Sequence, residues 1–374
     1  MTRSFVSTPQ YVQAAGALSE LGSHVERLGT TALLVTDEAV RDVVAETVDE
    51  SFATARADYQ LALFGGECTE PEISRLSDIA RGCGADVIVG TGGGKAIDVA
   101  KGVRGLIGGA LVSLPTVAST DAPTSGLSVR YTADGRLAGG VVHERRPDVV
   151  LVDTAVVAAA PTRWFASGIG DALATRFEAA ATVESGGETV AGGRPTRAGV
   201  ALAEECYETL RAYAPAAVDS VTEGTVTDAV EETVEAIVLL SGLGFENGGL
   251  AGAHAIHDGI VSAVETEATH GEKVCFGLLT QLALEGRSAA TRRDITQFAS
   301  GVGLPVTLDG VGASTADVEA IATASTDSVS LGNQPGDPTP VDVVEALLAA
   351  DELGQSQSSA GEPDEERGDD HRPE

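Results

Sequence analysis

Three of the six histidines in the chain, His254, His257 and His270, fall within seventeen residues. His254 and His257 are three residues apart, so they share one face of a helix, and His270 stands where a second helix should begin. Imidazoles with one carboxylate suit zinc, and three protein ligands leave a coordination position open for substrate. The candidate carboxylate is Asp171, in the apolar, glycine-rich stretch GIGDALATRFEA. Ordinary polar histidines at helix ends are the alternative, but the clustering with Asp171 favours a metal site.

A glycine-rich stretch, GTGGGKAIDVAKGV, occupies residues 90–103 and follows a short β-branched run. It is not a nucleoside-triphosphate loop, because Val89 stands where the first glycine belongs and Ala96 replaces the hydroxyl residue. The usual dinucleotide fingerprint is met poorly and would come at the third strand. Glycines still let backbone N–H groups approach a pyrophosphate, and a helix opening near Lys95 would aim its positive end at that group. A tight glycine turn without a ligand is the alternative.

The elements that must position these residues alternate in the first half of the chain. Continuous apolar runs separated by helical stretches predict a parallel sheet covered on both faces. Ligands of such sheets bind beyond the carboxyl ends of the strands. Asp37 ends the first predicted strand and could accept from ribose hydroxyls, although a lone strand-end aspartate is more often a helix cap. The predicted strands are 31–36, 59–64, 85–90, 110–116 and 148–153.

The pattern changes after Pro161 to long Ala-, Glu-, Val- and Leu-rich segments with apolar residues at helical spacing. We therefore predict an α/β domain over 1–160 and an all-helical domain over 161–353. The last stretch, 354–374, is polar and acidic without periodicity, which predicts a disordered tail.

Composition restricts the partners of the protein. The chain has 374 residues, of which 43% are hydrophobic, and a formal net charge of −32. Such a surface repels nucleic acid and anionic membranes, so neither is expected as a partner. No apolar run approaches the length of a membrane span, and the four cysteines form no CxxC pair, which predicts a cytoplasmic protein without disulfides. An acidic chain with only three lysines resembles proteins of salt-loving microbes, in which molar salt screens self-repulsion.

Together these residues resemble the glycerol dehydrogenases of the iron-containing (group III) alcohol dehydrogenase superfamily, and the composition leads us to expect a halophilic archaeon as the source. The resemblance runs from PQYVQAAGAL to VEALLAADELG and is carried by GGGKAIDVAK, LPTVASTDAPTSGLSVRYT, GIGDALATRFEA, LLSGLGFENGGLAGAHAIHDG and HGEKV. It implies a Rossmann-like, dehydroquinate synthase-like N-terminal domain that binds NAD and a helical C-terminal domain. One catalytic zinc would lie in the cleft between them, and the protein would form a homo-oligomer, typically an octamer.

The resemblance also implies roles for single residues. The zinc ligands fall on Asp171, His254 and His270, and the substrate-contacting aspartate on Asp121. A carboxylate at Asp37 would repel a 2′-phosphate, so NAD is expected over NADP. The implied cofactor contacts fall at the end of the first predicted strand, in the glycine turn and from the threonine of LPT onward, namely on Asp37, Gly92, Gly93, Gly94, Lys95, Thr116, Ser119, Thr120, Ser125, Leu127 and Tyr131.

One departure concerns the metal. Iron-dependent members carry a histidine four residues after the ligand aspartate, where this chain has Thr175. The loss of one imidazole favours zinc with a position open for both hydroxyls of a 1,2-diol. The expected reaction is the NAD-dependent oxidation of glycerol and related 1,2-diols to dihydroxyacetone by hydride transfer. His257 is either a proton relay in this reaction or a packing residue behind the ligands.

Three other functions stay open at this point. An sn-glycerol-1-phosphate dehydrogenase shares the glycine turn and the triad, but typically has a histidine where this chain has Thr120. A 2-oxo acid reductase uses the same scaffold. A non-catalytic nucleotide-binding protein is the alternative from another class, although such a protein would be expected to lose metal ligands first.

Overall fold

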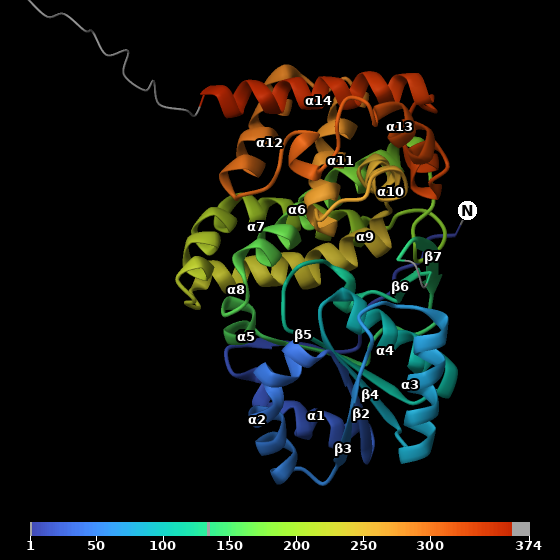
Figure 1. Ribbon diagram of the computed structural model, residues 1–374, viewed down its shortest axis with the longest axis vertical. Coiled ribbons are helices and arrows are strands. Elements are labelled where there is room, and N and C mark those ends of the chain that lie inside the picture. The colour runs from blue at the N-terminus through green and yellow to red at the C-terminus, as the bar shows by residue number, and fades with distance from the viewer. Residues whose placement is uncertain (1, 133–134, 361–374) are drawn as a thin grey trace, which may run out of the picture.

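A computed structural model describes residues 2–132 and 135–360. An α/β half carries the first part of the chain and a helical half carries the second, stacked one on the other (Figure 1). The strands of the α/β half are β1 (Tyr11–Ala14), β2 (Thr31–Thr36), β3 (Asp58–Leu63), β4 (Val87–Gly92), β5 (Ala110–Pro115), β6 (Leu127–Tyr131), β7 (Leu137–Val142) and β8 (Val149–Asp153). Its helices are η1 (Ala17–Glu20), α1 (Leu21–Leu28), α2 (Glu38–Thr54), α3 (Glu70–Cys83), α4 (Gly94–Ile107), η2 (Ala122–Thr124) and α5 (Thr154–Ala158).

Six strands form one parallel sheet in the order β1-β8-β5-β4-β2-β3. Alternate residues of β2 show why both faces are apolar. Ala32 and Leu34 pack with α1 and α2, whereas Leu33 and Val35 pack with α3 and α4 on the opposite face. The chain runs outward from β2 to β3 and then returns to β4 on the other side of β2. The carboxyl ends of β2 and β4 therefore flank the point where the strand order reverses, which is where such sheets bind ligands.

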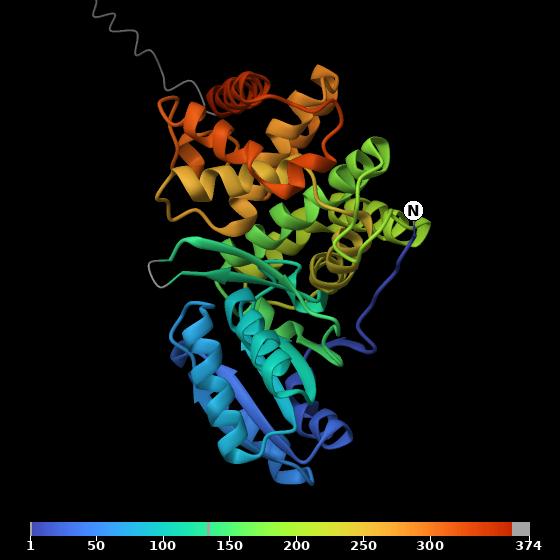
Figure 2. The same ribbon diagram turned by 90° about the vertical axis from the view of Figure 1, so that its right-hand side faces the viewer.

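The sequence predicted five of these strands correctly and missed three. β1 is a four-residue strand that pairs with β8. β6 and β7 form a separate antiparallel hairpin, which projects at the boundary between the two halves (Figure 2). Most residues of β7 are exposed and two of them are glycines, so neither an apolar run nor a clear alternation marks this strand.

The helical half packs around one large core to which α6 and α11 contribute many side chains. Its elements are α6 (Thr162–Ser185), α7 (Arg197–Thr222), α8 (Asp228–Glu235), the π-helical segment η3 (Ala236–Ser241), α9 (Gly242–Gly248), α10 (Gly252–Ala263), α11 (His270–Leu284), α12 (Ala289–Gly301), η4 (Asp309–Val311), α13 (Val318–Thr326), η5 (Val329–Asn333) and α14 (Pro340–Ala360). No single helix of the described residues is long and apolar enough to cross a membrane. One bent pair, Asp228–Gly248 with Gly252–Ala263, passes on length and composition alone.

The predicted disordered tail begins too early. Helix α14 continues to Ala360, so the prediction is wrong for residues 354–360, while 361–374 lie outside the described residues. The prediction rested on a polar, acidic stretch without periodicity. Gly354 and the serines after it also favour helices weakly. Gly354 instead allows a close approach: a Cβ there would lie 1.9 Å from the carbonyl oxygen of Val306.

Polar contacts help to fix the halves relative to each other. Arg146, in the loop before β8, donates from Nη2 to Oε1 of Glu246 on α9 at 2.9 Å, and the Glu246 side chain is fully buried. At the start of the chain, the N–H of Val6 donates to Oδ1 of Asn247 at 2.7 Å, and Asn247 Nδ2 donates back to the Val6 carbonyl at 2.9 Å. The orientation of the two halves is therefore set by buried polar contacts as well as by apolar packing.

His143 stands at the end of the hairpin. Its Nε2 lies 2.8 Å from Oγ of Ser128. Burial, followed by the positive charges of Arg130, Lys101 and Arg104, lowers the pKa of His143 from 6.5 to about 4. The ring is therefore neutral in the folded protein at neutral pH.

This pKa predicts a pH-dependent contribution to stability. Below pH 6.5 the unfolded chain binds a proton at His143 that the folded chain does not bind until about pH 4. The contribution is complete above pH 6.5 and is lost as the pH falls to about 4. In urea unfolding curves, His143→Gln should lose less stability across this window than the wild type. Equal losses would show that His143 does not contribute.

Candidate metal and cofactor site

Asp171, His254 and His270 come together although they lie on three helices. Asp171 lies in the middle of α6, His254 in the first turn of α10, and His270 begins α11. Oδ1 of Asp171 is 3.2 Å from Nε2 of His270 and 3.5 Å from Nε2 of His254. One ligand atom from each of the three residues lies within 4.8 Å of the others. The clustering predicted from the sequence is therefore present in the fold.

The spacing of these atoms fits a tetrahedral cation. Bonds of about 2.0–2.2 Å from zinc to nitrogen and oxygen place neighbouring tetrahedral ligands about 3.4 Å apart. The two distances that share Asp171 Oδ1 bracket that value. Asp171 is fully buried, and a buried carboxylate requires a positive partner. The residues present therefore fit a zinc ion with one position left for substrate.

The electrostatics of the triad agree with a carboxylate that stays ionised. Burial raises the pKa of Asp171, but His270 and His254 outweigh it, and the net pKa lies well below its usual value. Burial lowers the pKa of His254, whereas Glu178 and Asp171 raise it to a net value well above the usual one. A bound cation would take over the role of the positive charge beside Asp171.

Glu178 holds His254 from behind. It lies on α6, seven residues after Asp171, and its side chain is fully buried. Its Oε2 is 2.8 Å from Nδ1 of His254, and its Oε1 accepts from the N–H of His254 at 3.0 Å and of Ala251 at 2.8 Å. Such a carboxylate fixes the ring and leaves Nε2 free for a metal.

His270 also has a partner on its outer nitrogen. Its Nδ1 lies 2.9 Å from Nε2 of His257. Nδ1 of His257 lies 3.1 Å from Oδ1 of Asp258, and Ser328 donates to Asp258 Oδ2 at 2.6 Å. Burial, followed by the charge of His270, lowers the pKa of His257 to about 3, so this ring is neutral. His257 thus lies behind the ligands, and its role as a proton relay stays a prediction.

Asp121 lies beside the triad. Its backbone N–H donates to Oδ2 of Asp171 at 3.1 Å, and Ser241 donates to its Oδ2 at 2.8 Å. Burial and then the charge of Asp171 raise the pKa of Asp121 well above its usual value. Thr175, the position at which the resemblance led us to expect a histidine in iron-dependent members, has its hydroxyl oxygen 2.8 Å from that of Ser241. Thr175 therefore supports Asp121 through Ser241.

The π-helical segment Ala236–Ser241 positions Ser241. It interrupts a long helix that α8 begins and α9 continues, and Ser241 is its last residue. The carbonyl of Val238, within this segment, accepts from Thr124 Oγ1 at 3.0 Å. Gly242 allows the approach, because a Cβ there would lie 1.9 Å from Thr124 Oγ1. Irregular helix turns of this type are frequent at functional sites.

The glycine turn lies at the carboxyl end of β4, at the reversal of strand order. Gly93 stands at the N-cap of α4 and has no side chain that could accept from the first N–H groups of the helix. These N–H groups are therefore available to a ligand. Asp37 caps α2 by accepting from Val40 N at 2.8 Å, and its Oδ2 faces the turn, 3.9 Å from a Cβ built on Gly92. Thr116 joins the turn through its N–H, which donates to the Gly92 carbonyl at 3.2 Å. Asp37 is thus a cap and also faces the candidate phosphate site.

The other predicted cofactor residues connect this turn to the triad. The carbonyl of Ser119 accepts from Ser167 Oγ on α6 at 3.1 Å, and Oγ1 of Thr120 lies 3.4 Å from a Cβ built on Gly94. Lys95 is exposed, pairs with Glu67, and its Nζ lies 5.3 Å from the ring centroid of Tyr131. Contacts of these residues with a cofactor stay a prediction.

Ser125 and Leu127 are engaged inside the protein. The ammonium group of the fully buried Lys101 donates to the carbonyl of Leu127 at 2.6 Å and lies 3.4 Å from Ser125 Oγ. It also pairs with Asp98 at 3.0 Å. Lys101 therefore fastens the segment that follows Asp121 onto α4.

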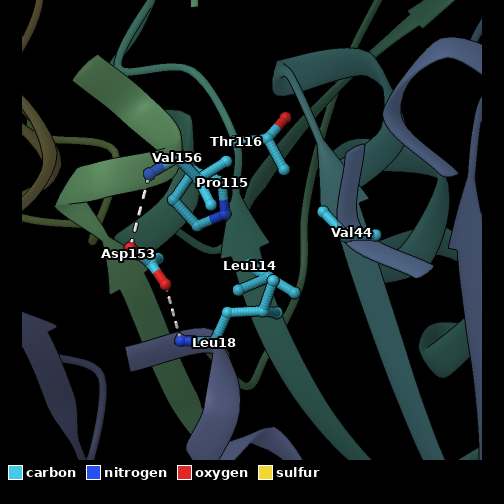
Figure 3. A pocket seen from close by; sticks show the side chains of 7 residues that line it. All are labelled: Leu18, Val44, Leu114, Pro115, Thr116, Asp153 and Val156. Carbon is cyan, nitrogen blue, oxygen red and sulfur yellow. Dashed lines mark hydrogen bonds between the residues drawn. The ribbon is translucent and has the colours of Figure 1, made fainter. Parts of the chain in front are cut away.

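A hollow lies at the carboxyl end of β5, and Figure 3 shows Thr116 among the side chains around it. It is lined by Leu18, Val44, Leu114, Pro115, Thr116, Asp153 and Val156, and has no room for a water molecule. Asp153 is occupied there by the N–H groups of Leu18 and Val156, as the dashed lines show. The hollow is therefore a packing gap in this structure.

Sequence reasoning missed Glu178, Ser241, Asp258 and Ser328. One signal was available for Glu178, because it lies two helical turns after Asp171 and a carboxylate at that spacing shares its face. Asp258 follows His257 directly but had no pattern of its own. Ser241 and Ser328 reach the site only through the tertiary fold.

Comparisons with known proteins agree with this architecture. Residues 8–154 match the family described as iron-containing alcohol dehydrogenase. Over 360 residues the chain is 49% identical to a glycolaldehyde reductase of Halobacterium salinarum, an alignment that covers 95% of this chain and 99% of that relative. The chain belongs to the iron-containing alcohol dehydrogenase family.

The chain is also 42% identical over 362 residues to a glycerol dehydrogenase of Escherichia coli, with 95% and 98% of the two chains covered. Its fold matches the crystal structure of a probable glycerol dehydrogenase from Sinorhizobium meliloti with a TM-score of 0.90 and 39% identity, over 95% of this chain and 99% of that one. The predicted resemblance and fold class are therefore confirmed, and the protein is an oxidoreductase.

Proposed function

We propose that the protein is an NAD- and zinc-dependent dehydrogenase that interconverts glycerol and related 1,2-diols with dihydroxyacetone and the corresponding hydroxycarbonyl compounds. One observation carries the proposal. The backbone of Asp121, in the segment that leads away from the candidate cofactor turn, donates directly to the triad carboxylate Asp171. A cation held by the triad and a nucleotide held by the turn would therefore face the same short segment.

The chain's own residues divide the work. When bound, zinc would polarise the substrate hydroxyl and NAD would accept the hydride. Asp171 supplies the negative charge of the cation site, and Glu178 keeps the Nε2 of His254 aimed at it. Asp121, held by Ser241, is the residue we assign to the second hydroxyl of the diol.

A second candidate substrate is glycolaldehyde. The Halobacterium salinarum relative that is 49% identical to this chain is named a glycolaldehyde reductase. Glycolaldehyde and dihydroxyacetone both carry a hydroxyl beside a carbonyl, so a site for one presents the same two oxygens as a site for the other. Reduction of glycolaldehyde by NADH would be the same reaction class in the opposite direction.

A substrate panel tests the proposal. Purified protein in molar potassium chloride would be assayed with glycerol, 1,2-propanediol, glycolaldehyde, glycerol 1-phosphate and a 2-oxo acid, using NAD(H) and NADP(H). We expect turnover of the unphosphorylated diol or hydroxyaldehyde, its loss on chelation, and its return with zinc. Preference for glycerol 1-phosphate or the 2-oxo acid, or full activity without metal, would contradict the proposal. Assembly into an octamer stays an expectation from the family.

Cofactor choice gives a separate prediction. Asp37→Ser keeps a residue that can cap α2 but removes the carboxylate that faces the glycine turn. Unit charges about 4 Å apart repel by about 1–4 kcal/mol near a protein surface. The ratio of kcat/KM for NADP to that for NAD should therefore rise about tenfold or more, since about 1.4 kcal/mol is a factor of ten. An unchanged ratio in steady-state assays would show that Asp37 does not face the ribose of the cofactor.

A further inference from the structure

We infer that Asp258, anchored by Ser328, acts through His257 to set the ring orientation and the tautomer of the metal ligand His270, and thereby the affinity of the site for its metal. None of these outer residues belongs to the triad. Asp258 follows His257 on α10, and Ser328 precedes η5. The inference rests on the proposed metal site, but it assigns a function to residues behind that site.

The direction of the hydrogen bonds from His270 to Asp258 follows from the nitrogen of His270 that would bind the metal. Nε2 of His270 faces Asp171, so a bound cation would occupy this nitrogen and leave the proton on Nδ1. That Nδ1–H must then donate to His257 Nε2, which lies 2.9 Å away. His257 must carry its own proton on Nδ1, and this Nδ1–H donates to Asp258 Oδ1 at 3.1 Å.

Asp258 makes this direction the stable one. An ionised carboxylate only accepts hydrogen bonds, so it selects the His257 tautomer with the proton on Nδ1. Without it, His257 could place its proton on Nε2, and two N–H groups would then face each other across 2.9 Å. The pair would have to rotate apart, and His270 would leave the orientation that aims Nε2 at Asp171.

The position of Asp258 is itself fixed. Ser328 donates to its second oxygen at 2.6 Å. The helix that carries Asp258 lies close to α13, because a Cβ on Gly259 would be 2.1 Å from Ser325 Oγ. The side chain of Asp258 is 31% exposed whereas that of His257 is 11% exposed, so the chain of contacts runs from the buried triad toward the surface.

Each candidate histidine ligand is thus linked to a carboxylate by hydrogen bonds. His254 contacts Glu178 directly, and His270 reaches Asp258 through one intervening imidazole. Outer partners of this type commonly change metal affinity by about 10–100-fold when removed. The same range is the expected effect at Asp258.

The experiment measures zinc affinity on the full chain in molar potassium chloride, by competition with a chromophoric chelator. Asp258→Leu should weaken zinc binding by about 10–100-fold, whereas Asp258→Asn should keep most of the affinity because its amide oxygen still accepts from His257 Nδ1–H. The matched control Asp327→Asn removes an exposed carboxylate next to Ser328 and should bind zinc like the wild type.

A double-mutant cycle isolates the route through His257. If Asp258 acts only through this ring, Asp258→Leu should add no further loss in a His257→Leu background. Wild-type affinity in Asp258→Leu, equal losses in the Leu and Asn variants, or an undiminished extra loss in the double variant would overturn the inference. Melting temperatures of the metal-free variants separate loss of the fold from loss of the ligand geometry. Absence of zinc binding by the wild type would refute the proposed function itself, which is a different result.

Discussion

Asp171→Asn should abolish both zinc binding and turnover while NAD binding stays intact. The substitution keeps the shape of the side chain but removes the only carboxylate of the triad, and the amide that replaces it is a poor ligand for zinc. Loss of a direct ligand should exceed the roughly 10–100-fold loss expected for an outer partner. NAD should still bind, because the glycine turn lies on β4 and α4 and shares no side chain with the triad.

Three measurements check this prediction. Equilibrium dialysis gives the zinc content, fluorescence titration gives the NAD affinity, and absorbance at the NADH band gives turnover. Glu184→Gln is the matched control, because it removes an exposed carboxylate from the same helix. Wild-type zinc content in the Asp171 variant would exclude Asp171 as a ligand, and simultaneous loss of NAD binding would indicate general damage to the fold.

Gly271→Ala should destabilise the protein and displace His270 at the same time. Gly271 follows His270 in the first turn of α11, and a Cβ there would lie 1.7 Å from the carbonyl oxygen of Ser167 on α6. The obstacle is backbone and cannot rotate away, so α11 must move from α6, the helix that carries Asp171. Overpacking of this kind typically costs about 1–3 kcal/mol, and zinc affinity should fall with it.

Gly82→Ala is the matched control, because it adds the same methyl group at a position with open space. Gly82 lies in α3 with nothing within 4 Å of an added Cβ, so alanine should stabilise the helix by about 0.5–1 kcal/mol. Urea is the suitable denaturant, because guanidinium chloride is itself a salt and would change the screening of a protein with a net charge of −32. Equal unfolding midpoints for the two variants would show that the contact between α6 and α11 is not as close as described.

The parts of the fold that local patterns determine were predictable from the sequence. Strands such as Thr31–Thr36 are continuous apolar runs because both faces of the sheet are covered. The clustering of three scarce histidines indicated a candidate metal site, and the family resemblance then implied Asp171, His254 and His270 as its ligands. Asp37 and the glycine turn follow neighbouring strands, so the topology of a parallel sheet brings them together.

Other features depend on contacts between distant segments and left no pattern in the sequence. The π-helical segment before Gly242 exists where Thr124 contacts the Val238 carbonyl. Helix α14 continues through Gly354 and lies against the backbone of Val306. Only glycine allows this close contact, because a Cβ at this position would meet the Val306 carbonyl. The partners of the candidate ligands, such as Ser328, lie far along the chain from the histidines that they support.

An anomalous difference map collected at the zinc edge, on crystals grown with zinc and NAD, tests the central claim most directly. We predict one strong peak within about 2.0–2.2 Å of Asp171 Oδ1, His254 Nε2 and His270 Nε2, with the nicotinamide of NAD beside it. A peak at another group of residues, or no peak between these three atoms at full zinc occupancy in solution, would contradict the claim.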